Sequence, residues 1–189
     1  RPIFDFITHK KPGQIDTAEI QQLKAYIRYT EAIAGIEVMG LHEKDARFLD
    51  MPFYKTGEVK KAPIGEDDVQ IVLDLFNERK PDHIYVAGDL SDPHGTHRMC
   101  YTAIKRALEK YNQQEGVKKP LVWLYRGAWQ EWEIEKADIF LPMSKADLNQ
   151  KIDAIYKHAS QKDRALFPGS DAREFWERAR DRNVGLARE

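Results

Sequence analysis

Apolar residues recur at three- and four-residue intervals in several stretches of the chain, which is the spacing of one helix face. The first stretch contains Ile20, Leu23 and Ile27, follows a capping signal at 16–19 and ends at Gly40. Further helices are predicted from 65 to a break at 80–82, from about 93 to 113, from 144 toward 158, and around 175–176. The apolar face of the helix from 65 consists of Val69, Val72, Leu73 and Phe76.

Short apolar runs without helical spacing predict strands between these helices. The run 83–88 is almost continuously apolar, which is typical of a central parallel strand covered on both faces. A second strand is predicted at 121–125, and a shorter one at 47–51 stops at Pro52. The alternation of strands and helices predicts an α/β protein, a Rossmann-like three-layer sandwich with a mainly parallel sheet.

Composition and charge narrow the classes of protein that this chain can represent. Its 189 residues suffice for one domain, and 30 basic against 31 acidic residues give a net charge of −1. This balance argues against binding to nucleic acid or to an anionic membrane, and no apolar run approaches the roughly 20 residues that span a bilayer. The single cysteine, Cys100, cannot form an intrachain disulfide, so we expect a cytoplasmic protein. As a thiol in a predicted helix, Cys100 is interpreted as a core residue in preference to a nucleophile.

Parallel sheets place their binding sites at the carboxyl ends of the strands, which here directs attention to the loops 50–56, 88–97 and 125–132. The middle loop carries Asp92, His94 and His97, with Asp92 and the following proline forming a good helix start. His94 and His97 would then lie one turn apart on one helix face. Two such imidazoles can share a metal, or one can bind metal while the other handles protons. The alternative is that Asp92 caps the helix and both histidines line a polar surface.

The run 92–98, Asp-Pro-His-Gly-Thr-His-Arg, resembles the second motif of the LmbE/PIG-L family of zinc-dependent N-acetylglucosaminyl deacetylases. The resemblance implies that His97 is a zinc ligand and that His94 stabilises the oxyanion of the tetrahedral intermediate. In such a site Asp92 can orient one of these imidazoles, a role that competes equally with helix capping. The Arg-x-x-Glu run at 28–31 and the His-x-Ser-Gln run at 158–161 resemble further family segments.

Longer runs at 48–54, 87–90, 123–129 and 173–176 are similar to the LmbE-like domain of Bacteroidetes-type glucosamine-6-phosphate deaminase/isomerase fusion proteins. In those proteins the LmbE-like domain follows a sugar-phosphate deaminase domain in one polypeptide. The similarity extends over essentially all of 1–189, so the chain is predicted to be a single LmbE-like domain. A covalently linked deaminase domain is expected in the parent protein.

Four further residues are candidates for contacts with an amino sugar or sugar phosphate. Arg126 follows a predicted strand and suits sugar hydroxyls or a phosphate. Arg28 is a second candidate, although it can equally pair with an acidic neighbour on the helix surface. Tyr54 and Trp129, together with Trp132, can stack on a sugar ring or serve in packing.

The family's first motif, His-Pro-Asp-Asp, does not occur in the sequence. The resemblance implies that this motif supplies two zinc ligands and the general base, so the first strand and helix of the sheet are expected to be missing with it. His9 in an N-terminal loop, His42 in a turn and His83 at a strand start are predicted to be structural or surface residues. We therefore expect a fragment of a larger polypeptide that is inactive alone.

Two functions remain open. The first is zinc-dependent removal of an acetyl group from an N-acetylated amino sugar or conjugate by the intact domain. The second is a non-catalytic domain that binds a sugar phosphate or mediates assembly beside the deaminase domain, and self-association into a homo-oligomer also stays open.

Overall fold

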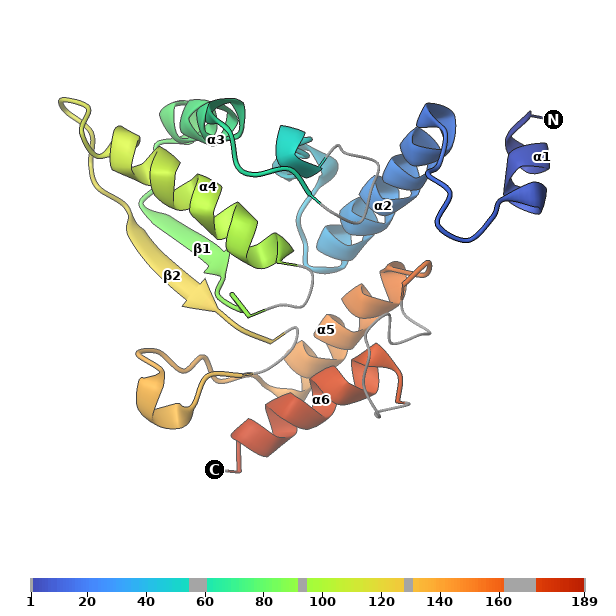
Figure 1. The fold of residues 1–189 in the computed structure, drawn as a ribbon. Coiled ribbons are helices and arrows are strands. Elements are labelled where there is room, and N and C mark those ends of the chain that lie inside the picture. Colours follow the sequence, from blue (N-terminus) through green and yellow to red (C-terminus); the bar gives the residue numbers. More distant parts are fainter. Residues whose placement is uncertain (1, 55–60, 92–94, 128–130, 162–172, 189) are drawn as a thin grey trace. The chain divides into compact units, whose positions relative to one another are not determined.

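The computed structural model describes residues 2–54, 61–91, 95–127, 131–161 and 173–188, and its contacts divide the chain into two compact units (Figure 1). The α/β unit is the continuous stretch Leu49–Asp138. The helical unit combines Arg1–Phe48 with Ile139–Glu189. Each unit is built around its own packed elements.

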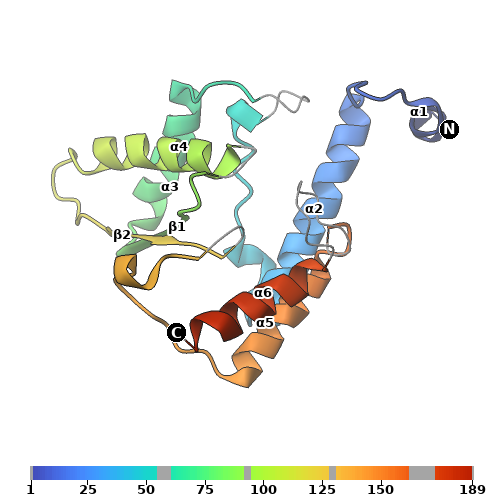
Figure 2. The same ribbon diagram turned by 60° about the horizontal axis from the view of Figure 1, so that its bottom comes forward.

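The α/β unit contains two parallel strands, β1 (His83–Ala87) and β2 (Leu121–Tyr125), paired in register from His83 opposite Leu121 to Ala87 opposite Tyr125. Helices α3 (Glu66–Arg79) and α4 (Thr96–Tyr111) lie on one face of this sheet in both views (Figures 1 and 2). The described part of the chain is thus an α/β protein with parallel pairing, and both strands confirm the prediction from the sequence. The short 3-10 helices η2 (Pro52–Tyr54) and η3 (Ile134–Lys136) complete this unit.

The core of the α/β unit lies between α3 and α4. Helix α3 buries the apolar face predicted for it, and α4 contributes three small or aromatic residues. Phe76 and Tyr111 meet edge to face with ring centroids 5.8 Å apart. The buried members are Val69, Val72, Leu73, Phe76, Ala103, Ala107 and Tyr111.

A buried carboxylate fixes the start of α3. Asp68 is 2% exposed, and its side chain accepts hydrogen bonds from the N–H of Phe53 at 3.0 Å and of Gly65 at 2.9 Å. The second bond caps the helix, and the first ties α3 to η2, fifteen residues earlier in the chain. The helix ends at Arg79 because Lys80 adopts a left-handed conformation with φ of 46°, as the break predicted at 80–82 requires.

Three expectations from the sequence differ from the structure of these segments. The predicted strand at 47–51 is wrong, because Asp50 has a φ of 51° and the backbone therefore leaves the extended conformation. Helix α4 begins at Thr96, with Gly95 at the N-cap in a left-handed conformation (φ 66°), so Asp92 is not the residue that starts it. The expectation that β1 is covered on both faces is also wrong, since Tyr85 is 65% exposed.

The helical unit consists of α1 (Pro2–His9), α2 (Ala18–Val38), α5 (Lys145–Lys157) and α6 (Phe175–Leu186), with the short helix η1 (Glu43–Asp45) after α2. Helix α5 packs against both α2 and α6. Helix α1 corrects the prediction of a loop around His9, whose ring nitrogen bonds to the carbonyl of Asp5. The predicted cap of α5 is confirmed, because Ser144 Oγ accepts from the N–H of Asp147 at 3.2 Å.

A carboxylate on α2 joins that helix to the chain that follows α5. Glu31 accepts hydrogen bonds from the N–H of Ser160 at 2.6 Å, from its hydroxyl at 2.8 Å and from Nε2 of Gln161 at 3.5 Å. Burial raises the pKa of Glu31, but these hydrogen bonds outweigh burial, so the pKa of the carboxyl lies below its usual value. The charge of exposed Arg28 also lowers this pKa, which agrees with the interpretation of Arg28 as a helix-surface residue.

Replacing Glu31 with glutamine is expected to lower the free energy of unfolding at pH 7 by about 1 kcal/mol, a value reduced for partial exposure. The pKa of Glu31 is lower in the folded protein than in the unfolded chain, where it is about 4.3. The ionised carboxylate therefore stabilises the folded state fully above about pH 4.3, and this stabilisation is lost as the pH falls through the folded-state pKa. The difference between the two proteins should therefore shrink below about pH 4.3. Urea denaturation between pH 3 and pH 7 measures this, with exposed Glu37→Gln on α2 as the control. A difference that stays constant with pH would contradict the assignment.

Candidate functional site

The carboxyl ends of β1 and β2 meet at Gly88 and Arg126, the residues that directly follow the two strands. The N–H of Gly88 donates to the carbonyl of Tyr125 at 2.7 Å, which extends the pairing of the strands by one bond. A Cβ atom at Gly88 would lie 2.8 Å from Cβ of Leu124 and 3.2 Å from the ring of Trp132. Glycine at this position therefore allows the aromatic ring to lie against the strand end.

Arg126 is held at the end of β2 by contacts on two sides. Its Nε donates to the carbonyl of Gly88 at 3.5 Å, and its guanidinium carbon lies 3.7 Å from the centre of the Trp132 ring. Trp132 is fixed in turn, because its Nε1 donates to the carbonyl of Leu124 at 3.1 Å. Stacking uses the flat face of a guanidinium and keeps its in-plane N–H groups directed toward oxygen acceptors. The arrangement suits a phosphate or carboxylate ligand.

Asp89 is a residue of this loop that was not singled out from the sequence. It is 2% exposed, and its Oδ1 accepts from the hydroxyl of Ser91 at 3.4 Å. A buried carboxylate requires hydrogen-bond partners, so Asp89 stabilises the conformation of the loop that leaves β1. The signal in the sequence was an acidic residue directly after an apolar strand.

His97 is the second residue of α4 and is partly buried. Its Nδ1 is buried and has no hydrogen-bond partner among the residues that the structure describes. A buried polar nitrogen without a partner costs about 1–3 kcal/mol, so a hydrogen-bond or metal partner for this nitrogen is expected. A metal ion or a ligand oxygen are both suitable partners for this nitrogen.

The other site residues predicted from the sequence fall into two groups. Asp92, His94 and Trp129 lie outside the described residues. Tyr54 lies in η2, is 59% exposed and has Nζ of Lys61 at 5.1 Å from its ring centre. Arg28 is exposed on α2 and belongs to the helical unit, not to the α/β unit that carries Arg126.

Within the described ranges, no three His, Cys, Asp or Glu side chains come together as a group that could hold a metal ion. A catalytic zinc normally takes three protein ligands. His97 can offer one of them through the unpaired Nδ1, but the described residues do not complete a zinc site. No helix in this part of the chain combines the length and apolar character needed to cross a membrane.

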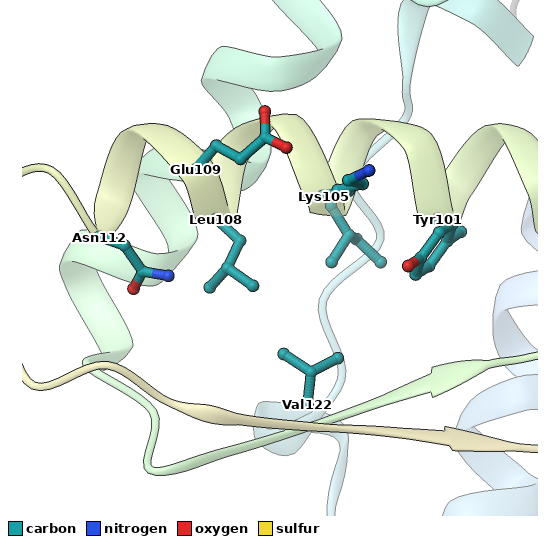
Figure 3. A pocket seen from close by; sticks show the side chains of 7 residues that line it. Tyr101, Lys105, Leu108, Glu109, Asn112 and Val122 are labelled. Atoms are coloured by element: carbon teal, nitrogen blue, oxygen red, sulfur yellow. The ribbon is translucent and has the colours of Figure 1, made fainter.

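A separate hollow lies between α4 and β2, with a volume of about 280 Å³ (Figure 3). Its walls are mainly apolar. The residues that line it are Tyr101, Ile104, Lys105, Leu108, Glu109, Asn112 and Val122. It contains neither Arg126 nor His97, so it is distinct from the strand-end cluster.

The fold and this cluster define an α/β protein with a polar site at the ends of parallel strands. The chain is 46% identical over 184 residues to a glucosamine-6-phosphate deaminase-like protein of Bacteroides thetaiotaomicron. The match covers 96% of this chain but 28% of the relative, so the chain corresponds to one segment of a longer protein there. No family model and no solved structure matches. The expected similarity to a segment of a deaminase-type polypeptide is confirmed, whereas membership of the LmbE/PIG-L family stays a prediction.

Proposed function

We propose that this chain is a domain that accompanies a glucosamine-6-phosphate deaminase-like polypeptide and binds a phosphorylated amino sugar at the strand-end site. The observation that carries the proposal is the match of 96% of the chain to one segment of such a relative. Covalent linkage would hold such a domain and a sugar-phosphate enzyme at a high effective concentration relative to each other. Amino-sugar metabolism is the context in which we place it.

The chemistry of the strand-end site supports a phosphorylated ligand. Arg126 is stacked on Trp132 and held by the Gly88 carbonyl, so its orientation is fixed before a ligand arrives. A fixed guanidinium loses less conformational entropy on binding than a mobile side chain does. The buried Asp89 stabilises the neighbouring loop and is a positioning residue in this proposal.

Replacing Arg126 with methionine is expected to raise the Kd for glucosamine-6-phosphate at least about tenfold, because the charge and the hydrogen-bond donors are lost. Isothermal titration calorimetry measures this, and glucosamine without the phosphate should bind weakly to both proteins. The control is Arg79→Met, an exposed arginine at the end of α3 in the same unit. Equal binding by both variants would contradict the proposed role of Arg126.

A second candidate function, zinc-dependent deacetylation of an N-acetylated amino sugar, is favoured by the buried, unpartnered Nδ1 of His97. When bound in such a site, zinc activates water and polarises an amide carbonyl. A zinc-dependent deacetylase of the predicted kind would have a larger, Rossmann-like sheet. The parallel pairing of β1 and β2 agrees with such a sheet. Metal content of the purified chain, compared with His97→Ala and with exposed His83→Ala, tests this candidate. Equal metal content in all three proteins would exclude His97 as a ligand.

A further inference from the structure

The hollow between α4 and β2 has the features of a docking groove. Its apolar walls come from Ile104 and Leu108 on the helix and from Val122 on the strand (Figure 3). Val122 extends toward the helix in this view, yet it is 37% exposed. Lys105 and Glu109 carry the charges at the margin. An apolar channel with a charged margin suits a polypeptide segment whose side chains alternate between the channel and water.

The edge of β2 beside the groove offers backbone groups to such a segment. The N–H of Leu121 donates to Asp82 and the carbonyl of Tyr125 accepts from Gly88, so these residues face β1. Because backbone groups alternate along a strand, those of Val122 face the opposite edge. The sheet has two strands within the described ranges, so this edge has no strand beside it there. Toward the carboxyl end, the indole of Trp132 bonds to the Leu124 carbonyl and limits pairing to the first half of β2.

We propose that this groove and the adjoining edge of β2 bind an extended apolar segment of the linked polypeptide that lies outside these 189 residues. The inference rests on the proposed function, in which the chain accompanies a deaminase-like part. The source of the segment follows from the comparison, because the matched stretch is only 28% of the Bacteroides relative and more than two thirds of that protein lies beyond it. Its side chains pack between Leu108 and Val122.

Hydrogen exchange measured by mass spectrometry tests the docking, using the 189-residue chain and the full-length Bacteroides relative. The amide of Val122 in this chain should exchange at least about tenfold faster than the amide at the aligned position of the relative, after correction for intrinsic rates. Amides of the buried α4 residues Ala103 and Ala107 should exchange alike in both proteins and serve as the reference.

Equal exchange at the β2 edge in both proteins would overturn the proposal. Protection that rises with concentration in the 189-residue chain would overturn it as well, because a second copy would then fill the groove. Titration of this chain with glucosamine-6-phosphate is a separate readout. If the ligand binds but the edge exchanges equally, the docking inference fails alone. If the edge is protected in the relative but the ligand does not bind, the sugar-phosphate role fails and the docking stands.

Discussion

Replacement of Asp68 by alanine is expected to lower the free energy of unfolding by about 2–4 kcal/mol, because two backbone N–H groups lose their acceptor. One of them belongs to Phe53, which is 2% exposed, so water cannot readily replace the carboxylate there. Urea denaturation followed by circular dichroism measures the change. The substitution should also loosen the η2 segment that carries Tyr54, since its tie to α3 is removed.

The matched control is Asp67→Ala, which removes an exposed carboxylate from the same helical turn. We expect this control to change stability by no more than about 0.5 kcal/mol. Asp68→Asn keeps one acceptor oxygen and should fall between the two. If Asp67→Ala and Asp68→Ala proved equally mild, the buried carboxylate would not have the structural role assigned to it.

Replacement of Gly88 by alanine is expected to destabilise the chain by about 2–3 kcal/mol, because the added methyl group overlaps Leu124 and Trp132. The Leu124 Cβ lies 2.8 Å from the new atom and belongs to a paired strand, so it cannot move without disturbing the sheet. The indole of Trp132 can move more easily than Leu124. Its displacement would remove the surface on which Arg126 stacks. The free energy of unfolding and the Kd for glucosamine-6-phosphate should both become less favourable.

Gly185 provides the comparison for this substitution. It lies in α6, and a Cβ atom there would have no neighbour within 4 Å. Gly185→Ala should therefore be neutral or stabilise the protein by up to about 1 kcal/mol through helix propensity. An unchanged stability in Gly88→Ala, measured by thermal and urea denaturation, would refute the close approach at the strand end.

The features predicted correctly from the sequence depend on local spacing. The buried face of α3 and the cap at Ser144 can be recognised because helix periodicity and capping operate over three or four residues. Arg126 was selected through a topological rule about the ends of parallel strands, and its role as a binding residue stays a prediction. The strand predicted at 47–51 was wrong because a local apolar run also suits a loop whose side chains pack on a core, as Leu49 and Met51 do.

The parts of the site that the sequence could not give depend on partners that are distant along the chain. Asp68 looked like one of several acidic residues in a first helical turn, and its contact with Phe53 distinguishes it. The stacking of Arg126 on Trp132 requires a loop conformation that no periodic pattern encodes. Asp89 follows a strand in the sequence, but only its burial marks it as structural.

The division of the chain into a continuous and a discontinuous unit has a consequence for synthesis. The α/β unit, Leu49–Asp138, is complete once that stretch has left the ribosome. The helical unit needs α5 and α6, and Glu31 meets Ser160, a residue 129 positions later. Helix α2 must therefore wait for α5, the helix against which it packs, until the last quarter of the chain appears. During that interval the nascent α2 benefits from protection against aggregation.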